Sequence, residues 1–255
     1  MNNIYYAIAS YHRPKCKTYY ALKECGIEDE RIVVCLNDSN DYKAYRQSLG
    51  SQARIILREG MYVSFNRNTC LNQFEDGQQI LLLDDDIRGF QKWYECSETK
   101  CGRCKKLTNE FEHEVKKIFD FMQTNEIKYV GSLPNDNRMN MSKLNMAGEQ
   151  YSYNTLLQGG FNFIIKNSKI VFDEKMKILD DYELCLRLIR QGEIIARNNT
   201  IVTNKPYMKK EKGGYYEIYQ TTNLQQQYLN LLKRKYDDMV TIRGNNLIIK
   251  RKWRI

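Results

Sequence analysis

Short apolar runs alternate with helix-compatible stretches along the first two-thirds of the chain. Each run is rich in β-branched residues and closed by a polar turn, which is typical of buried strands in a parallel sheet. Their alternation with helices predicts a doubly wound α/β fold, in which helices flank a mostly parallel sheet. The expected strands are residues 4–10, 31–36, 53–57, 79–83 and 128–131, with a further apolar segment at 156–165, and the expected helices are residues 17–25, 64–74 and 180–191.

Polar and charged side chains follow each of the first four apolar runs. Ligands of open α/β sheets bind at the carboxyl ends of the strands, so the residues after each run are the first to consider. Because these residues are acidic, basic or amide-bearing, the strand ends are expected to converge on an anionic or metal-bound ligand. They are residues 11–14, 37–41, 58–60 and 84–86.

Three consecutive carboxylates, Asp84, Asp85 and Asp86, directly follow the apolar run 79–83. Side chains at i and i+2 of an extended chain point the same way, so Asp84 and Asp86 can face one site while Asp85 faces another. Hard divalent ions such as Mg²⁺ or Mn²⁺ accept a few carboxylates together with the phosphate oxygens of a substrate. A solvated acidic turn that caps a helix is the alternative.

A second acidic pair, Asp180 and Asp181, begins the helix expected at 180–191, in which Leu184 and Leu188 share one face. Acids at a helix start are ordinary caps that complement the helix dipole. Alternatively, a carboxylate held beside a metal site can take a proton from an attacking acceptor hydroxyl. A base opposite the leaving group of a sugar implies inversion at the anomeric carbon.

The charge of the chain is concentrated near its C-terminus. The net charge is +9, and residues 203–255 contain 12 Lys and Arg against 4 Asp and Glu. This imbalance indicates either a polyanionic partner or a solvated basic tail. We therefore expect a catalytic domain at residues 1–202 and a basic lid or extension at residues 203–255.

Length and apolar content place the chain among folded proteins. Its 255 residues, 42% of them hydrophobic, suffice for one domain with a short appendage. Without an apolar stretch of about 18 residues or a basic region followed by an apolar core, we expect no membrane span and a cytoplasmic location, the host cytoplasm if the protein is viral. The eight cysteines are then expected to be reduced thiols or metal ligands.

Three of the cysteines form a cluster within a Cys-rich insertion expected at residues 94–106. Together with a following histidine they offer the donor types of a closed structural Zn²⁺ site, although only one pair has Cys-x2-Cys spacing. The alternative is a polar insertion with free thiols. The four expected ligands are Cys96, Cys101, Cys104 and His113.

These motifs, in this order, resemble the GT-A glycosyltransferases, and more narrowly the inverting enzymes similar to family 2. Residues 9–14 look like their first nucleotide-binding loop, Asp38 stands where they contact the nucleobase, and residues 84–86 look like their Asp-x-Asp motif. Residues 159–161 are similar to their acceptor-side glycine segment. The resemblance covers roughly residues 4–200.

The resemblance implies a role for each matching residue. The second acid of the pair, Asp181, is the expected catalytic base. Asp86 and Asp84 are the expected metal ligands, and Gly159, Gly160 and Asp180 are expected on the acceptor side. The residues expected to bind the donor are Ser10, Tyr11, Arg13, Asp38, Arg67, Asp84 and Asp85.

One expected metal ligand departs from the family pattern. Many relatives supply a histidine after the acidic helix, but the two histidines of this chain, His12 and His113, both precede it. The remaining metal shell is therefore not assigned by the resemblance.

A narrower resemblance is to phage glycosyltransferases that decorate hydroxymethylated pyrimidines in DNA, a group linked to TET-type hydroxylases. It implies a nucleoside-diphosphate sugar, preferentially a UDP-hexose, as donor and DNA as partner. Base extraction requires aromatic and basic residues near the pocket. The tail supplies such residues, although an exposed loop and ordinary packing explain them equally well: Lys209, Lys210, Lys212, Tyr215, Tyr216, Tyr219 and, as a phosphate or DNA contact, Arg243.

Two other functions fit the same motifs. The fold could transfer a sugar to a glycan, a protein or a small molecule, with the basic tail on acidic lipid or in solvent. A catalytically idle GT-A-like module that binds DNA is the third possibility.

Overall fold

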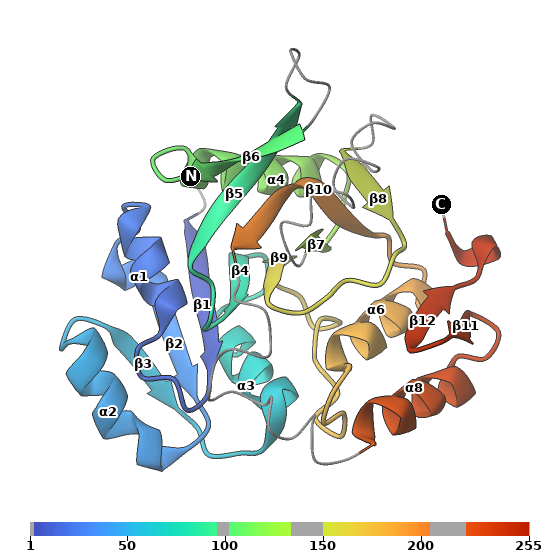
Figure 1. Ribbon diagram of the computed structural model, residues 1–255, viewed down its shortest axis with the longest axis horizontal. Coiled ribbons are helices and arrows are strands. Elements are labelled where there is room, and N and C mark those ends of the chain that lie inside the picture. The colour runs from blue at the N-terminus through green and yellow to red at the C-terminus, as the bar shows by residue number, and fades with distance from the viewer. Residues whose placement is uncertain (1–2, 96–101, 134–149, 205–222, 255) are drawn as a thin grey trace.

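The computed structural model describes residues 3–95, 102–133, 150–204 and 223–254. A ten-stranded mixed sheet forms its centre, with helices on both faces (Figure 1). The strands of this sheet are β1 Ile4–Ser10, β2 Ile32–Leu36, β3 Arg54–Leu57, β4 Gln79–Asp84, β5 Gly89–Glu95, β6 Gly102–Leu107, β7 Tyr129–Leu133, β8 Tyr151–Tyr153, β9 Phe161–Ile165 and β10 Ile195–Asn204.

Strand order explains how the polar strand ends come together. The order is β3-β2-β1-β4-β9-β7-β10-β5-β6, with β8 beside β10. The first four strands are parallel, whereas β9 runs antiparallel between β4 and β7. From β1 the chain adds β2 and β3 on one side and then returns to place β4 on the other side of β1. The strand order therefore reverses between β1 and β4, and ligands of such sheets bind in a crevice at the carboxyl ends of these two strands.

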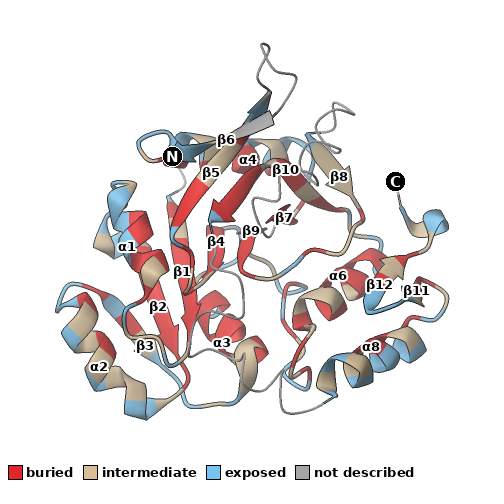
Figure 2. Cartoon of the chain, viewed as in Figure 1, coloured by how far each residue is buried: buried red, intermediate tan, exposed pale blue. Residues whose placement is uncertain are grey.

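Two apolar clusters bury the two faces of the sheet. Helices α1, α2 and α4 contribute to one cluster, and α3, α6 and α8 contribute to the other. Buried residues accordingly follow the central strands and the inward sides of the helices (Figure 2). The helices are α1 Lys17–Glu24, α2 Ser39–Leu49, α3 Tyr62–Leu71, α4 Phe111–Thr124, α6 Asp180–Arg190 and α8 Leu224–Lys235, with short 3₁₀ turns at Asp29–Arg31 and Arg251–Trp253.

The predicted α/β fold class with a mostly parallel sheet is confirmed, and the largest difference in an element boundary concerns the apolar segment 156–165. The apolar segment 156–165 forms a strand only from Phe161 onward. Gly160 has a φ of 108°, a left-handed conformation that favours glycine and interrupts the extended chain. Within the predicted Cys-rich insertion, the described residues belong to the antiparallel pair β5 and β6.

The described residues 223–254 form what we call the C-terminal unit. It contains α8 and a hairpin of β11 Val240–Arg243 with β12 Asn246–Ile249. Its buried side chains, including Leu229, Leu232 and Met239, belong to the same apolar cluster as those of α6. The predicted domain boundary after residue 202 lies two residues before the end of β10.

No helix among the described residues is long and apolar enough to cross a membrane.

Candidate functional site

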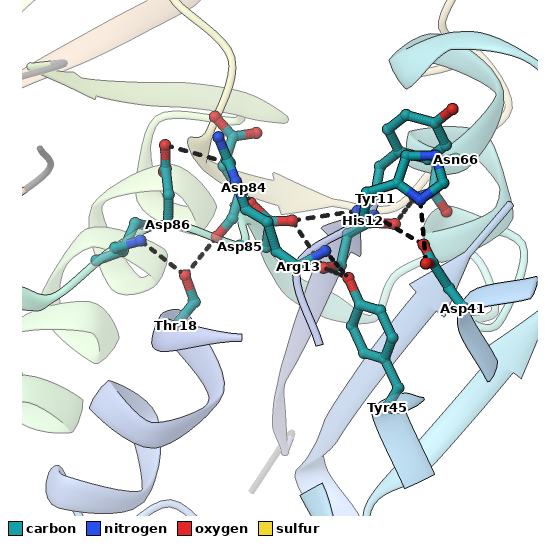
Figure 3. Close-up of polar contacts among 12 residues, drawn as sticks. Tyr11, His12, Arg13, Thr18, Asp41, Tyr45, Asn66, Asp84, Asp85 and Asp86 are labelled. Carbon is teal, nitrogen blue, oxygen red and sulfur yellow. Dashed lines mark hydrogen bonds and ion pairs between the residues drawn. The ribbon is translucent and has the colours of Figure 1, made fainter. Parts of the chain in front are cut away.

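The loops after β1 and β4 form the centre of the site (Figure 3). The two strands pair in parallel, with Ala9 opposite Asp84, so their carboxyl ends lie at the same edge of the sheet. On the other side of β1, Ser10 lies opposite Leu36 of β2. The fold therefore brings together three of the polar strand ends that the sequence pattern singles out.

Asp85 holds the loop after β1 in place. Its carboxylate accepts hydrogen bonds from Ser10 Oγ at 2.7 Å, Tyr11 N at 3.1 Å and Arg13 Nη1 at 2.7 Å. Tyr45 of α2 completes this network, since its hydroxyl lies 2.5 Å from Ser10 Oγ and accepts from Arg13 N at 2.9 Å. Burial raises the pKa of Asp85, against the opposing effect of the Arg13 guanidinium. Asp85 is thus placed to position the predicted donor loop from beneath.

Asp84 and Asp86 remain partly exposed at the end of β4, with side-chain exposures of 29% and 22%. The Oδ2 atom of Asp86 lies 3.5 Å from Arg13 Nη1. Among the described residues no group of three or more His, Cys, Asp or Glu side chains is arranged to hold a metal. Two accessible carboxylates instead suit a Mg²⁺ or Mn²⁺ ion that shares its remaining positions with substrate phosphates.

Asp38, the predicted nucleobase contact, caps the N-terminus of α2. Its carboxylate accepts from Asn40 N at 2.9 Å. Beside it, Asp41 accepts from His12 N at 2.7 Å and lies 3.0 Å from His12 Nδ1. The ring of Tyr11 lies 3.8 Å from that of His12. His12 and Asp41 therefore connect this loop to α2.

Arg67 of α3 joins the two acidic motifs. Its guanidinium lies 2.8 Å from Asp180 Oδ2 and 3.3 Å from Asp84 Oδ1, and the side chain is only 7% exposed. Burial lowers the pKa of Arg67, but the carboxylates of Asp180 and Asp84 outweigh this effect and raise it above the ordinary value. The predicted donor contact is thus enclosed between the end of β4 and the start of α6.

Glycine at position 159 has a direct steric reason. A Cβ atom added to Gly159 would lie 2.2 Å from Arg67 Nη2, closer than non-bonded atoms approach. The peptide N–H of Gly159 donates to Asp181 Oδ2 at 2.6 Å. Gly159 therefore packs on the buried guanidinium and contacts the predicted base at the same time, whereas Gly160 supplies the turn into β9.

The acids of the pair occupy different environments. Asp180 is 2% exposed and ion-paired with Arg67, whereas Asp181 is partly exposed. Asp181 Oδ1 accepts from Tyr182 N at 2.8 Å. Burial and the neighbouring charge of Asp180 raise the pKa of Asp181 to about 6. A carboxylate with this pKa is ionised at neutral pH and more basic than an ordinary aspartate, as a general base requires.

Two asparagines of α3 position the site although no motif pointed to them. Asn66 Nδ2 donates to Ser10 O at 2.9 Å and Cys35 O at 3.0 Å, which joins α3 to the ends of β1 and β2. Asn68 is likewise buried and exchanges hydrogen bonds with the backbone of Phe172. The polar residues 66–69 are consecutive in α3 and all buried, and this unbroken polar run is the sequence signal for these contacts.

The predicted zinc site and basic lid are described only in part. Cys104 is half-buried on β6 and His113 lies on α4, but Cys96 and Cys101 lie outside the described residues. The described part of the chain does not support the predicted zinc site.

Of the basic and aromatic residues predicted for the C-terminal extension, Arg243 is described and is the last residue of β11. The tail residues Lys209, Lys210, Lys212, Tyr215, Tyr216 and Tyr219 also lie outside the described residues.

The family model that matches the chain shows that the protein is a glycosyltransferase, and the sheet order is consistent with a GT-A-like fold. The chain belongs to the TET-associated glycosyltransferase family, whose model matches residues 9–214. No curated protein sequence matches the chain.

The fold is similar to that of the mannosyltransferase PcManGT from Pyrobaculum calidifontis, solved in complex with GDP-Man and Mn²⁺. The TM-score is 0.62 at 10% sequence identity, and the match covers 96% of this chain and 66% of the mannosyltransferase chain. At this identity the likeness supports the fold.

Proposed function

We propose that this glycosyltransferase moves a sugar from a nucleoside-diphosphate sugar to a hydroxyl group with inversion, and that its acceptor is a 5-hydroxymethylpyrimidine in DNA. The observation that carries the proposal is the buried Arg67, which holds Asp84 of the proposed donor side against Asp180 of the proposed acceptor side. This arrangement supports the proposal, because an inverting transfer needs a base close to the site that holds the diphosphate.

The donor is proposed to lie over the ends of β1, β2 and β4. Tyr11, Arg13 and Asp38 would contact the nucleotide, with UDP as the favoured nucleotide. Asp85 and the buried Ser10, whose hydroxyl bonds to Asp85 and Tyr45, would support this loop from below. Asp86 and Asp84 would hold Mn²⁺ or Mg²⁺, which when bound neutralises charge on the departing diphosphate. The GDP-Man and Mn²⁺ bound to the similar mannosyltransferase support this class of donor.

Asp181 is proposed to act as the base. Its ionised carboxylate would take the proton of the acceptor hydroxyl while the hydroxyl oxygen forms a bond to the anomeric carbon. The bond from that carbon to the diphosphate oxygen breaks on the opposite face, and the bonding electrons leave with the diphosphate. The Gly159 N–H, which donates to Asp181, and the Asp180–Arg67 pair would hold the carboxylate in this orientation.

DNA is the proposed acceptor because of the family assignment and the charge of the C-terminal unit. Residues 223–254 contain eight Lys and Arg against two Asp and Glu. One of the two acids, Asp238, is already paired with Arg190 of α6. The excess of cations, with Arg243 on the hairpin, suits contact with phosphates.

Transfer to DNA is tested by mass spectrometry of hydroxymethylated DNA incubated with the protein, Mn²⁺ and a panel of nucleotide sugars. We expect the mass of a hexose to be added to the modified pyrimidine with at least one donor.

Asp86→Ala should lower the rate of sugar transfer by at least about 100-fold, because metal stabilisation of a leaving group is worth several kcal/mol. Asp76→Ala, which removes an exposed acid before β4, is the matched control. Sugar appearing only on glycans or small molecules would reject the DNA acceptor.

Binding to DNA should also depend steeply on salt. With about four phosphate contacts, affinity is expected to fall about 100-fold between about 50 and 200 mM salt. Arg243→Ala should reduce the slope of log affinity against log salt by about 1. Fluorescence anisotropy with a labelled duplex measures both effects, and Lys116→Ala on the exposed side of α4 serves as the control. An unchanged slope in Arg243→Ala would remove Arg243 from the interface.

A further inference from the structure

A fully buried carboxylate links the proposed catalytic helix to the C-terminal unit. Glu183 lies on α6 two residues after Asp181 and is 0% exposed. Its Oε1 accepts from Lys235 Nζ at 2.8 Å and from Tyr236 OH at 2.9 Å, and its Oε2 accepts from Arg187 Nε at 3.3 Å. A buried carboxylate is tolerated only with such partners, and two of the three come from the C-terminal unit.

Further contacts join the C-terminal unit to the same helix. Arg190 donates to Lys235 O at 3.0 Å and to Asp238 Oδ1 at 2.5 Å, and its guanidinium lies 4.5 Å from the centre of the Tyr236 ring. Figure 1 shows α8 and the hairpin beside α6. The C-terminal unit is therefore attached to α6 at Glu183 and Arg190.

The first turn of α6 is also held by contacts from the site itself. Arg67 binds Asp180, and the Gly159 N–H binds Asp181. The residue before the helix, Leu179, has a φ of 58°, a left-handed conformation that costs energy for a leucine. The turn that carries the two acids thus starts from a strained residue and is held by contacts from the site and from the C-terminal unit.

The C-terminal unit lies outside the part of the chain that matches the family, which ends at residue 214. We propose that this unit braces α6 through Glu183, and that Lys235 and Tyr236 are positioning residues for Asp181. This inference rests on the proposed role of Asp181 as base. A base must lie within about 2.6–3.2 Å of the proton it removes, and a displacement of about 1 Å can cost about 100-fold in rate.

Removal of both positioning groups tests the brace. In Tyr236→Phe/Lys235→Met, kcat for transfer should fall at least about 10-fold while KM for the donor stays within about twofold, because the donor loops do not contact Glu183. The single variant Lys235→Arg keeps a cation beside Glu183 and retains Tyr236, so its kcat should stay within about threefold of wild type. Lys235→Met alone is the milder variant if the double variant does not fold.

The matched control is Asp238→Asn. It breaks the Arg190 ion pair in the same interface without touching Glu183, so kcat should stay within about twofold of wild type. If the double variant loses no more kcat than Asp238→Asn, the brace is refuted and the unit only stabilises the fold. A rise in KM for the donor at unchanged kcat would also overturn it.

Hydrogen exchange separates this inference from the proposed function. Without any substrate, the amides of residues 181–184 should exchange at least about tenfold faster in the double variant than in Asp238→Asn. Equal exchange in the two variants would overturn the brace even if the wild type transfers sugar. Faster exchange in a protein that transfers no sugar would keep the brace of α6 and reject the proposed function.

Discussion

Asp181→Asn is expected to lower the rate of sugar transfer by about 10²- to 10⁴-fold, the usual contribution of a general base. Asparagine can still accept the hydrogen bond from Gly159 N, so the donor should bind with nearly unchanged affinity. Steady-state kinetics of transfer, combined with calorimetric titration of the nucleotide donor, measure both quantities. Asp120→Asn, at an exposed acid on α4, is the control.

The pH dependence gives an independent check on Asp181. Because burial and Asp180 raise its pKa to about 6, the wild-type kcat should rise with pH through about 6 as the base becomes ionised. A raised pKa in the folded state also means that ionisation of Asp181 costs stability above the unfolded pKa. At neutral pH, Asp181→Asn should therefore be at least as stable as wild type. More than about a tenth of wild-type activity in this variant would reject the base assignment.

Arg67→Met is expected to lower the free energy of unfolding by about 3–5 kcal/mol, the typical cost of removing one partner of a buried ion pair. The substitution leaves Asp180 buried without its cation and removes the contact to Asp84. A buried carboxyl with a raised folded-state pKa stabilises the fold at low pH and loses this contribution as the pH rises. The deficit should accordingly be larger at about pH 8 than at about pH 5, measured by urea denaturation.

Two variants distinguish the ion pair from the size of the arginine. Arg58→Met removes an exposed arginine that lies over the Phe65 ring and should change stability by less than about 1 kcal/mol. Arg67→Met/Asp180→Asn removes both charges and should recover at least half of the loss, since no unpaired buried charge remains. Equal stability of the single and double Arg67 variants would show that packing, rather than charge, is responsible.

The fold class was predictable because it depends on a pattern that is local in the sequence. Apolar runs with polar ends identified β1, β2, β3 and β4, and the predicted parallel arrangement is confirmed for these strands. Helix ends were less accurate, as α3 covers Tyr62–Leu71 rather than 64–74. The antiparallel insertion of β9 between β4 and β7 was not predicted, since strand direction depends on contacts far apart along the chain.

The presence of acidic residues at the end of β4 was predictable from neighbours in sequence, but the directions of their side chains were not. Alternation in an extended chain predicts that Asp84 and Asp86 face one site and Asp85 another. In the structure β4 ends at Asp84 and the chain turns at Asp85 and Asp86, so Asp86 lies near Arg13, as Asp85 does, whereas Asp84 contacts Arg67. The partner of each acid could not be read in this way: Asp85 binds the loop after β1, whereas Asp84 binds Arg67 of α3. These pairings join residues that lie 17 or more positions apart, so only packing brings them together.

By itself, the sequence determined the α/β class, the acidic residues at one strand end and one helix start, and the concentration of positive charge in the last 53 residues. Hydrophobic periodicity and local charge are properties of short segments, so they can be recognised in the sequence without knowing which residues are in contact. The tertiary structure alone decided that Arg67 joins the two acidic motifs and that Glu183 joins the helix to the C-terminal unit. A buried charge requires an oppositely charged or hydrogen-bonding partner nearby in space, and the two residues can be separated by any distance along the sequence.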